Sequence, residues 1–300
     1  MFLMEIKGIV AAMVTPMFDD GSINEAELRN QVNRQVAAGV DGIFTLGTNG
    51  EFYIMSMEEK KRVMQIVVDE AKKRVPIYAG AGCVSTADTV ELAQTAQDMG
   101  VDALSLVTPY FAALNQSELY EHFSSVSKSV DVPIVLYNIP ARAGVSIDYT
   151  TVAKLANNCS NIKGVKDSSG NFDNILRYIE ATDSNTFSVL SGNDSLILWT
   201  LMAGGKGGIT AVANVIPEVM VSIYQNYIKG DIAAAKTAQD SIRAIRDCFK
   251  YGNPNSIIKA ATNIIGQPVG PCRKPFGLIS DEAIKGITET IDKCYPQYKK

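Results

Sequence analysis

The sequence predicts an α/β protein, a (β/α)8 TIM barrel with a C-terminal helical extension, and three observations support this prediction. Short apolar runs rich in β-branched residues recur at regular spacing, and a longer stretch of helical periodicity follows each. Such alternation implies a parallel sheet with right-handed crossovers, either an open doubly wound sheet or a closed barrel. Eight units favour the barrel. The sequence also lacks the early Gly-x-Gly-x-x-Gly turn that would mark an open dinucleotide-binding sheet.

The strands are identified as short, almost continuously apolar segments, which is typical of strands covered on both faces. They are predicted at residues 9–14, 42–46, 76–81, 103–107, 133–137, 162–166, 187–190 and 207–211. Each run ends at or near Gly, Thr, Asn or Pro, residues that commonly begin turns.

The helices are identified by apolar residues at helical spacing with charged residues opposite them. The clearest examples are residues 24–38, 56–73, 85–99 and 115–128. Beyond Pro217 the strand pattern stops, and three helical stretches remain at residues 231–249, 255–265 and 281–293. We therefore expect residues 1–225 to form the barrel and residues 226–300 to form a helical extension packed on it.

Composition excludes several classes of protein. The chain has 300 residues, of which 46% are hydrophobic and 20% charged, as in ordinary globular domains. A formal net charge of -4 gives no general attraction for nucleic acid or anionic lipid. No apolar run approaches the roughly 20 residues that span a bilayer, and the first residues do not resemble a signal peptide. We expect a cytoplasmic protein with no nucleic-acid or membrane partner.

Cysteine and histidine usage argues against a metal site. The five cysteines are scattered without zinc-ligand spacing, so we interpret them as packing residues or inert thiols. The only histidine, His122, lies in a predicted helix, which excludes any multi-histidine metal site. We expect no metal.

In a barrel of this class the active site lies at the carboxyl ends of the strands. The segments in which the predicted strands end, or into which they lead, are 46–51, 107–111, 137–142, 164–170 and 191–194, and the last strand itself reads 207–210. Candidate catalytic residues are therefore sought in these segments.

Lys166 is the most informative of these residues. Strand alternation places Ile162, Gly164 and Lys166 on one face, so an inward-facing Gly164 would leave space beneath a lysine at the barrel mouth. An amine held there is partly desolvated, which favours the uncharged nucleophile that forms a Schiff base with a ketone. The alternative is a solvated lysine that closes a strand.

Two further groups suit the same chemistry. Tyr137 ends the preceding strand and should neighbour Lys166, where its phenol could carry protons during imine formation and carbon–carbon cleavage. The tight turn at residues 47–50 could hold a carboxylate on its backbone N–H groups, and Thr48 could relay protons to Tyr137. Taken alone, each of these features is explained more simply by an ordinary tyrosine at the barrel rim or by a sharp loop.

Other motifs receive weaker interpretations. Arg142 follows Tyr137 by one loop and could bind a substrate carboxylate in bidentate geometry, or form a surface ion pair. The glycine-rich segment 204–208 lacks the Walker spacing and is best explained as a turn into the last strand. Tyr110 and Phe111 are candidates for rim packing or a subunit contact.

Taken together, Gly47-Thr-Asn-Gly-Glu51, Tyr137-Asn-Ile-Pro140 and Gly164-Val-Lys166 resemble motifs of the dihydrodipicolinate synthase / N-acetylneuraminate lyase family. These proteins are pyruvate-dependent class I aldolases, and the resemblance covers residues 8–277 approximately. It implies a (β/α)8 barrel with a C-terminal helical extension, commonly a tetramer of paired dimers. No metal or organic cofactor is implied.

The resemblance also assigns roles within the site. Lys166 would be the Schiff-base lysine and Tyr137 the catalytic phenol, while Thr48 and the backbone at Asn49 would bind the carboxylate of pyruvate. Ile209 would contribute a main-chain contact beside it. The pocket beyond Lys166 would be lined by short polar side chains suited to hydroxyl groups, namely Asp167, Ser168, Asn193 and Asp194.

The motifs do not agree on one family member. Arg142 falls where the synthases carry the arginine that holds the aldehyde substrate's carboxylate. Phe111 stands where those enzymes usually have a tyrosine that completes a proton relay in the neighbouring subunit, and phenylalanine cannot relay a proton. The turn reads Gly-Thr-Asn-Gly rather than the usual Gly-Thr-Thr-Gly.

Two other properties of relatives are not supported. The lyase family has a glutamate and a serine that contact the sugar where this chain has Ser195 and Ala211. The positions at which some synthases bind lysine as an inhibitor read Phe52, Met57, Cys83 and Val84 here, so inhibition of that type is not expected.

The expected function is therefore a Schiff-base-forming aldolase or lyase that handles pyruvate. Because Phe111 breaks the relay, reversible aldol cleavage of a 2-keto-3-deoxy sugar acid or related 2-oxo acid is the first expectation. Condensation of pyruvate with aspartate semialdehyde by a 4-hydroxy-tetrahydrodipicolinate synthase is the alternative, because of Arg142. A non-catalytic keto-acid-binding relative and a barrel with a phosphate site near residues 204–208 are two further hypotheses.

Overall fold

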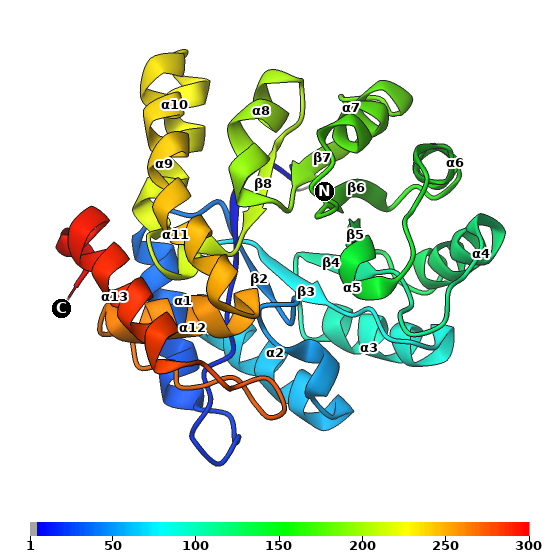
Figure 1. Ribbon diagram of the computed structural model, residues 1–300. Helices are drawn as coiled ribbons and strands as arrows, with labels where there is room; N and C mark the ends of the chain where they lie inside the picture. The colour runs from blue at the N-terminus through cyan, green and yellow to red at the C-terminus, as the bar shows by residue number, and fades with distance from the viewer. Residues whose placement is uncertain (1–4, 300) are drawn as a thin grey trace.

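The computed structural model describes residues 5–299, in which eight parallel strands form a closed barrel (Figure 1). The strands are β1 (Gly8–Ala12), β2 (Gly42–Thr45), β3 (Ile77–Gly80), β4 (Ala103–Val107), β5 (Ile134–Asn138), β6 (Ile162–Asp167), β7 (Ser188–Ser191) and β8 (Gly207–Thr210). Each strand pairs with its sequence neighbours, and β8 closes the barrel on β1 with Gly8 opposite Gly207. The predicted barrel is thus confirmed, with strand ends shifted by one or two residues.

Helices cover the outside of the barrel, and most begin at a side-chain cap. They are α1 (Glu25–Ala37), α2 (Met57–Ala71), α3 (Thr86–Asp98), α4 (Gln116–Ser127), α5 (Pro140–Ala143), α6 (Tyr149–Asn158), α7 (Phe172–Ala181), α8 (Ile197–Met202) and α9 (Pro217–Ile228). Ser56 and Asn115 each form a capping box, with Glu59 and Glu118 respectively. Short 3-10 helices are η1 (Phe52–Ile54), η2 (Asp194–Leu196) and η3 (Val212–Asn214). None of the helices between residues 5 and 299 has the length and apolarity that a bilayer crossing requires.

Two apolar clusters form the core, one on each side of the barrel wall. The smaller cluster fills the barrel interior and consists of Ile6, Val10, Ala12, Phe44, Tyr78, Ala103, Val135, Leu190 and Ile209. The larger cluster lies between the strands and the helices and contains the alternate strand residues, such as Ile9, Ile43 and Leu104. Burial on both faces explains why the strands lack polar alternation.

The predicted alternation along β6 is wrong at its start. Ile162 belongs to the larger cluster, on the helix side of the wall together with Val165, and not on the face of Lys166. A register shift causes this, because Ile134 pairs with Ile162 whereas Val135 pairs with Gly164. Gly164 is required by the close approach of β7 and not by a need for space beneath the lysine. A Cβ at position 164 would lie 2.7 Å from the Ser188 carbonyl oxygen of β7.

The extension comprises α10 (Ile232–Ser241), α11 (Arg243–Asp247), η4 (Cys248–Tyr251), α12 (Pro254–Ile264), α13 (Asp281–Cys294) and η5 (Pro296–Tyr298). The single helix predicted at 231–249 is interrupted after Ser241. Tyr295 Oη donates to the Ser241 carbonyl oxygen (2.5 Å) and accepts from Ile245 N (3.3 Å), which replaces one helical hydrogen bond. The boundary expected between residues 225 and 226 falls inside α9.

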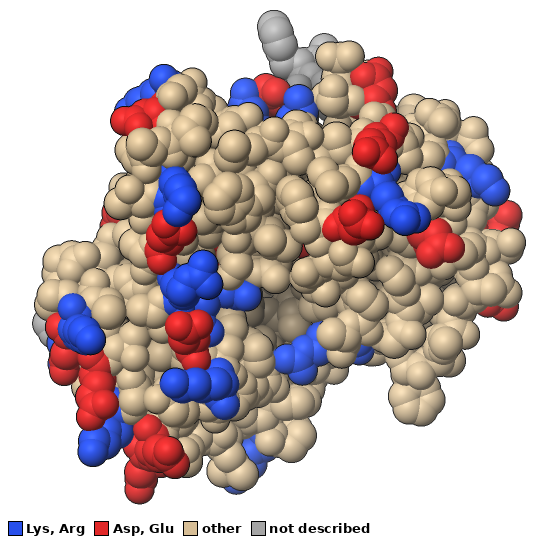
Figure 2. Space-filling view, turned by 45° about the horizontal axis from the view of Figure 1, so that its top comes forward, with Lys and Arg blue, Asp and Glu red and all other residues tan. Residues whose placement is uncertain are grey.

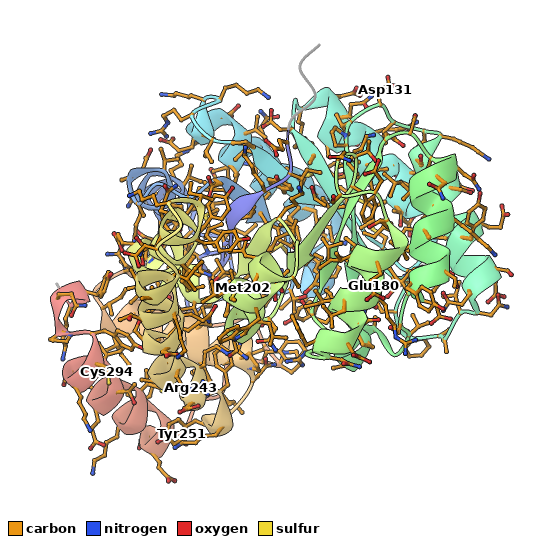
Figure 3. All side chains as sticks on the ribbon, turned by 90° about the horizontal axis from the view of Figure 1, so that it is seen from above. Asp131, Glu180, Met202, Arg243, Tyr251 and Cys294 are labelled. Atoms are coloured by element: carbon orange, nitrogen blue, oxygen red, sulfur yellow. The ribbon has the colours of Figure 1, made fainter. Side chains whose placement is uncertain are left out.

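The extension lies at the carboxyl end of the barrel. In Figure 3, Arg243, Tyr251 and Cys294 lie together on one side, whereas Asp131, which precedes β5, lies at the opposite end of the molecule. Two ion pairs connect it to the loops of the barrel mouth. Glu51 pairs with Lys259 of α12 at 2.6 Å, and Asp194 pairs with Arg246 of α11 at 3.4 Å.

His122 is a buried helical residue rather than a ligand. It is 4% exposed, and its Nδ1 lies 2.9 Å from Thr86 Oγ1 of α3. Burial lowers the pKa of His122 to about 4. The neutral imidazole is therefore the form that the folded state accommodates.

This burial predicts a loss of stability in mild acid. In the unfolded chain the imidazole titrates near pH 6.5, so its contribution to the free energy of unfolding is complete above that pH. The contribution falls as the pH drops toward the folded value of about 4. Between pH 7.5 and pH 4.5, we expect the free energy of unfolding, measured with urea, to fall by roughly 2–3 kcal/mol more for the unchanged protein than for His122→Gln. If the free energy of unfolding of the two proteins changed with pH by the same amount, this expectation would be contradicted.

Candidate active site

Lys166 of β6 is buried at the mouth of the barrel. The residue is 4% exposed, and its Nζ lies 3.9 Å from the centroid of the Tyr137 ring and 4.9 Å from that of Phe44. Within residues 5–299, no carboxylate lies within ion-pair distance of this amine. Lys166 is thus held between two aromatic rings rather than by a counter-ion, as a nucleophilic amine requires.

Tyr137 and Thr48 complete a cluster of three functional groups. Tyr137 of β5 pairs in register with Lys166, is 3% exposed, and packs edge-on against Phe44. Its hydroxyl lies 3.2 Å from Thr48 Oγ1. The amine, the phenol and the hydroxyl come from β6, β5 and the turn after β2, as the strand-end rule predicts. Together they can form an imine and transfer protons to and from it.

The turn at residues 47–50 is held against the end of β1 and the residues after it by hydrogen bonds from side chains to main-chain carbonyl groups. Thr15 Oγ1 donates to the Gly50 carbonyl oxygen (2.8 Å), and Asn49 Nδ2 donates to the Ala12 carbonyl oxygen (3.4 Å). Glu51 ends the turn with a left-handed φ of 58°. Because the Asn49 side chain is directed to β1, only its backbone N–H remains for an anion at the mouth.

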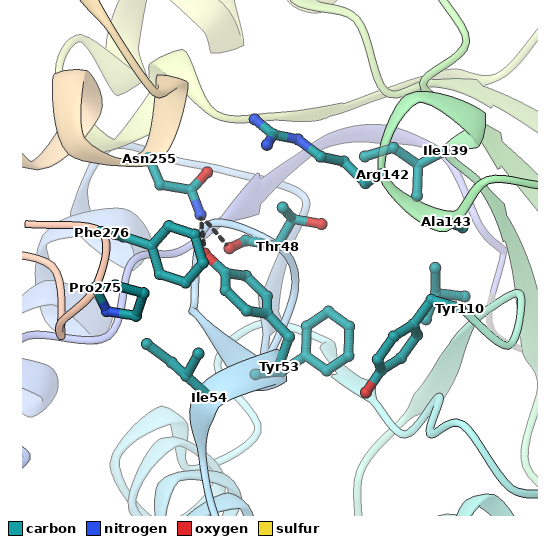
Figure 4. Close-up of a pocket in the computed structure, with 12 residues that line it drawn as sticks. Thr48, Tyr53, Ile54, Tyr110, Ile139, Arg142, Ala143, Asn255, Pro275 and Phe276 are labelled. Atoms are coloured by element: carbon teal, nitrogen blue, oxygen red, sulfur yellow. Dashed lines mark hydrogen bonds between the residues drawn. The ribbon is translucent and has the colours of Figure 1, made fainter. Parts of the chain in front are cut away.

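A cavity of about 490 Å³ opens beside Thr48 (Figure 4). Of the described residues that line it, only Arg142 carries a charge. The others are Thr48, Phe52, Tyr53, Ile54, Val107, Tyr110, Ile139, Ala143, Asn255, Pro275 and Phe276. A hollow with lysine or arginine side chains at its edges is visible near the centre of one face (Figure 2). The cavity combines apolar walls with one guanidinium, which suits a small organic anion.

Arg142 lies on the short helix α5 and reaches across the cavity toward α12. Its Nη2 donates to Asn253 Oδ1 at 3.4 Å, and the side chain is otherwise exposed. Among residues 5–299, no carboxylate lies within ion-pair distance of the guanidinium. Its five N–H donors therefore remain largely available to a ligand.

Ser168 lies near the lysine. A Cβ built at Gly192 would lie 2.0 Å from Ser168 Oγ and 2.9 Å from Lys166 Cε, so both atoms pack over the same glycine. Any side chain at position 192 would displace one of them. The structure thus places Ser168 beside Lys166.

The other residues of the proposed hydroxyl-binding set are committed to the protein. Asp167 is fully buried and accepts hydrogen bonds from Asn138 (2.7 Å), Asn174 (2.9 Å) and Ser169 (2.6 Å). Burial raises the pKa of Asp167, and these hydrogen bonds oppose the shift.

Asp194 and Asn193 are engaged in a similar way. Asp194 accepts a hydrogen bond from Ala211 N (3.1 Å) and pairs with Arg246, while Asn193 caps η2 through Ser195 N (3.1 Å). The carboxylate oxygens of Asp194 and the amide oxygen of Asn193 are thus engaged with protein partners.

The remaining candidates lie around the site. Ile209 is buried in the barrel interior, opposite Val10 in register. Tyr110 lines the cavity and packs edge-on against Phe52, and burial raises its pKa. Phe111 is fully exposed and has a φ of 85°.

The glycine-rich segment before β8 is explained by packing. A Cβ at Gly207 would lie 2.0 Å from the Gly8 carbonyl oxygen, and one at Gly205 would lie 2.5 Å from Thr200. The segment precedes β8, at the opposite end of the barrel from Lys166. Its glycines are therefore required by strand and helix packing, which removes the motivation for a phosphate site.

Sequence reasoning missed several residues of the site. Phe44 forms one face of the lysine's surroundings, and Asn255, Pro275 and Phe276 bring the extension to the cavity. The sequence around Phe44 predicts that its side chain faces the barrel interior, but no motif there indicates contact with the lysine. Within the described chain, no group of three His, Cys, Asp or Glu side chains is arranged to hold a metal ion.

Comparison with known proteins is consistent with this geometry. Residues 5–294 match the model of the dihydrodipicolinate synthetase family. A 4-hydroxy-tetrahydrodipicolinate synthase of Methanopyrus kandleri is 42% identical over 91% of both chains. One of Methanothrix thermoacetophila is 38% identical over 96% of both chains.

Solved structures agree with the fold. A crystal structure of a dihydrodipicolinate synthase superimposes with a TM-score of 0.92 at 34% identity, covering 96% of this chain and 98% of that one. A prophage protein of the dihydrodipicolinic acid synthase family from E. coli K12, solved in complex with pyruvate, has a TM-score of 0.93 at 29% identity. It covers 96% of this chain and 98% of its own.

Proposed function

Because this chain belongs to the dihydrodipicolinate synthetase family, we propose that it is a 4-hydroxy-tetrahydrodipicolinate synthase that condenses pyruvate with aspartate semialdehyde. Membership makes it an enzyme, a lyase of the lysine Schiff-base class that handles pyruvate. The observation that carries the proposal is the buried Lys166 amine beside the Tyr137–Thr48 pair, with Arg142 in the adjoining cavity.

The first half of the reaction uses the clustered groups. Lys166 Nζ attacks C2 of pyruvate, and loss of the carbonyl oxygen as water leaves an imine. Removal of a proton from C3 then gives an enamine. Tyr137, with Thr48 3.2 Å away, moves the protons of these steps, and the backbone N–H groups of the turn hold the pyruvate carboxylate.

The second half uses the cavity. The enamine carbon attacks the aldehyde carbon of aspartate semialdehyde, and the new alkoxide takes up a proton. The substrate's own amine then attacks the imine carbon, which closes the ring and releases the Lys166 amine. Arg142 holds the semialdehyde carboxylate during these steps by bidentate hydrogen bonds.

Three observations favour condensation over cleavage of a ketodeoxy sugar acid. The curated relatives described above, at 38% and 42% identity, are named as synthases. Asp167 and Asp194, two of the side chains expected to bind sugar hydroxyls, are buried and engaged with protein partners. The open cavity offers a guanidinium and apolar walls, which suit a short anionic aldehyde better than a polyhydroxylated chain.

Cleavage of a 2-keto-3-deoxy sugar acid remains the second candidate because of Phe111, which has no hydroxyl to serve in a proton relay. The test is to compare kcat/KM for pyruvate plus aspartate semialdehyde with kcat/KM for ketodeoxy sugar acids. We expect the synthase reaction to be favoured by roughly a hundredfold, the effect of one well-placed carboxylate–guanidinium contact. More efficient cleavage than condensation would overturn the assignment, and failure of both would favour a non-catalytic keto-acid-binding protein.

Arg142→Ala should weaken binding of the aldehyde alone. Loss of a hydrogen-bonded charge pair costs about 1.5–3 kcal/mol, so the KM for aspartate semialdehyde should rise about 10–100-fold. The pyruvate concentration that half-saturates reductive trapping should not change. Arg142→Lys keeps the positive charge but loses the two parallel N–H donors of the guanidinium, so its KM for aspartate semialdehyde should be intermediate. An equal change in both constants would show that Arg142 acts on the site as a whole.

We also propose that the chain forms a homodimer or homotetramer in which Tyr110 and Phe111 lie at a subunit contact. Phe111 is fully exposed and has a φ of 85°, a conformation that bulky residues rarely adopt. A strained, exposed aromatic side chain is typical of a residue that another surface covers. Sedimentation velocity would measure the oligomeric state.

A further inference from the structure

Asn255 of α12 contacts the turn that carries Thr48. The residue is 3% exposed, and its Nδ2 donates to the Thr48 carbonyl oxygen (2.6 Å) and to Tyr53 Oη (3.0 Å). Figure 4 shows both bonds, with Asn255 reaching down from the extension toward Thr48 and Tyr53. Asn255 N in turn donates to Asn253 Oδ1, the cap of α12 (3.2 Å). A single buried amide therefore links the helical extension to the barrel mouth.

The position of this hydrogen bond within the turn matters. The Thr48 carbonyl group and the Asn49 N–H group belong to the same peptide unit, which is planar and trans. They point in opposite directions, so an interaction that fixes the carbonyl oxygen also fixes the direction of the N–H. Hydrogen bonding at the oxygen further polarises the N–H and makes it a stronger donor.

The Thr48 carbonyl oxygen accepts hydrogen bonds both from within the turn and from Asn255 outside it. Glu51 N also donates to the Thr48 carbonyl oxygen (3.1 Å), which closes the turn but comes from the turn itself. Asn255 supplies the contact from outside. Burial raises the pKa of Tyr53 to about 12, so its hydroxyl stays neutral and can accept from the amide at working pH.

We propose that Asn255 is a positioning residue for pyruvate, which orients and polarises the Asn49 N–H that binds the keto-acid carboxylate. This inference rests on the proposed function, since it concerns the carboxylate subsite of the same reaction. It makes the extension part of the active site, because its helix α12 holds the donor geometry at the mouth. Asn255 itself touches no reacting atom in this role.

Reductive trapping with cyanoborohydride tests the proposal, because it reports pyruvate binding at Lys166 without the second substrate. For Asn255→Ala, the pyruvate concentration that half-saturates trapping should rise about tenfold, the effect of one lost hydrogen bond. The trapping rate at saturating pyruvate should change little. A matched control is Asn263→Ala in the same helix, which removes an amide donor to the Gly270 carbonyl oxygen (3.0 Å) far from the turn. The control should bind pyruvate normally.

Asn255→Asp provides a readout that a purely structural role would not move. Above its pKa the new carboxylate would face the Thr48 carbonyl oxygen as a second acceptor, and half-saturation should rise roughly thirtyfold or more. When protonated, the carboxyl group can donate again. Burial and the facing Thr48 carbonyl oxygen disfavour the charged form, so the pKa of the new carboxyl group should lie well above the value of about 3.9 for an exposed aspartate. The ratio of the half-saturating pyruvate concentrations of the variant and the unchanged protein should therefore fall toward the alanine value or below it between about pH 8.5 and about pH 5.5.

The outcomes separate this inference from the proposed function. If the unchanged protein traps no pyruvate at any concentration, the proposed function fails. If it traps pyruvate and Asn255→Ala has the same half-saturation, or if Asn255→Asp shows a ratio independent of pH, the role of Asn255 is refuted. If Asn263→Ala weakens pyruvate binding as much as Asn255→Ala does, the effect belongs to α12 as a whole and the inference is likewise overturned.

Discussion

Replacing Lys166 with methionine is expected to abolish turnover, by about 10⁴-fold or more. Methionine keeps an unbranched side chain against the Phe44 and Tyr137 rings, so the packing of the amine's stem is retained while the nucleophile is lost. Without the amine, no imine with pyruvate can form. Treatment with pyruvate and borohydride, followed by mass spectrometry, should add one reduced pyruvate to the unchanged protein and none to Lys166→Met.

The matched control is Lys163→Ala on the same strand. Lys163 is half-buried and borders a different pocket, formed with residues such as Glu5 and Lys206. Its removal should leave trapping and turnover unchanged. Peptide mapping should locate the adduct at Lys166, and an adduct on another lysine, or full trapping in Lys166→Met, would refute the Schiff-base assignment.

The arrangement of the barrel could be predicted because its strands are buried on both faces. Apolar runs at regular intervals leave few alternatives once the crossovers must be right-handed. The place of Ile162 could not be predicted, since the irregularity opposite Ile134 and Val135 exists only when β5 and β6 pair. The break after Ser241 similarly depends on Tyr295, which is distant in sequence.

The catalytic cluster was predictable for a related reason. Lys166 and Tyr137 lie near the carboxyl ends of β6 and β5, and Thr48 follows β2. Because these ends meet at one mouth, the proximity of the three residues is a consequence of topology. Because side chains alternate along a strand, Asp167 is expected to point to the opposite face from Lys166. On that face it meets Asn138 and Asn174.

Other side chains of the site depend on distant partners. Asp194 is engaged by Arg246, which lies in the extension. Asn255 reaches Thr48 across 207 positions of sequence, and no local pattern marks such a contact.

The ion pair between Glu51 and Lys259 anchors the extension to the barrel. Both side chains are almost fully buried, with Glu51 Oε1 2.6 Å from Lys259 Nζ. Lys259 Nζ also donates to the Pro271 carbonyl oxygen (2.8 Å), and Glu51 Oε2 accepts from Arg273 N (2.8 Å). Each charge therefore has its partner and one further main-chain hydrogen bond, which is the condition under which a buried pair is tolerated.

Removing one member of this pair should be far more costly than removing both. Lys259→Met leaves the Glu51 carboxylate buried with only the Arg273 N–H, and Glu51→Gln leaves the ammonium beside a neutral amide. We expect each single change to lower the free energy of unfolding by about 3–5 kcal/mol. The double variant keeps an amide oxygen for Arg273 N and buries no charge, so it should lose at least 2 kcal/mol less than the two single losses combined, roughly the coupling of a close pair. Urea unfolding followed by circular dichroism measures all four proteins, and strictly additive losses would mean that the two charges do not stabilise one another.

Because Glu51 ends the turn at residues 47–50, the single variants that still fold should also require more pyruvate for half-saturation of trapping, and the double variant should recover part of that loss.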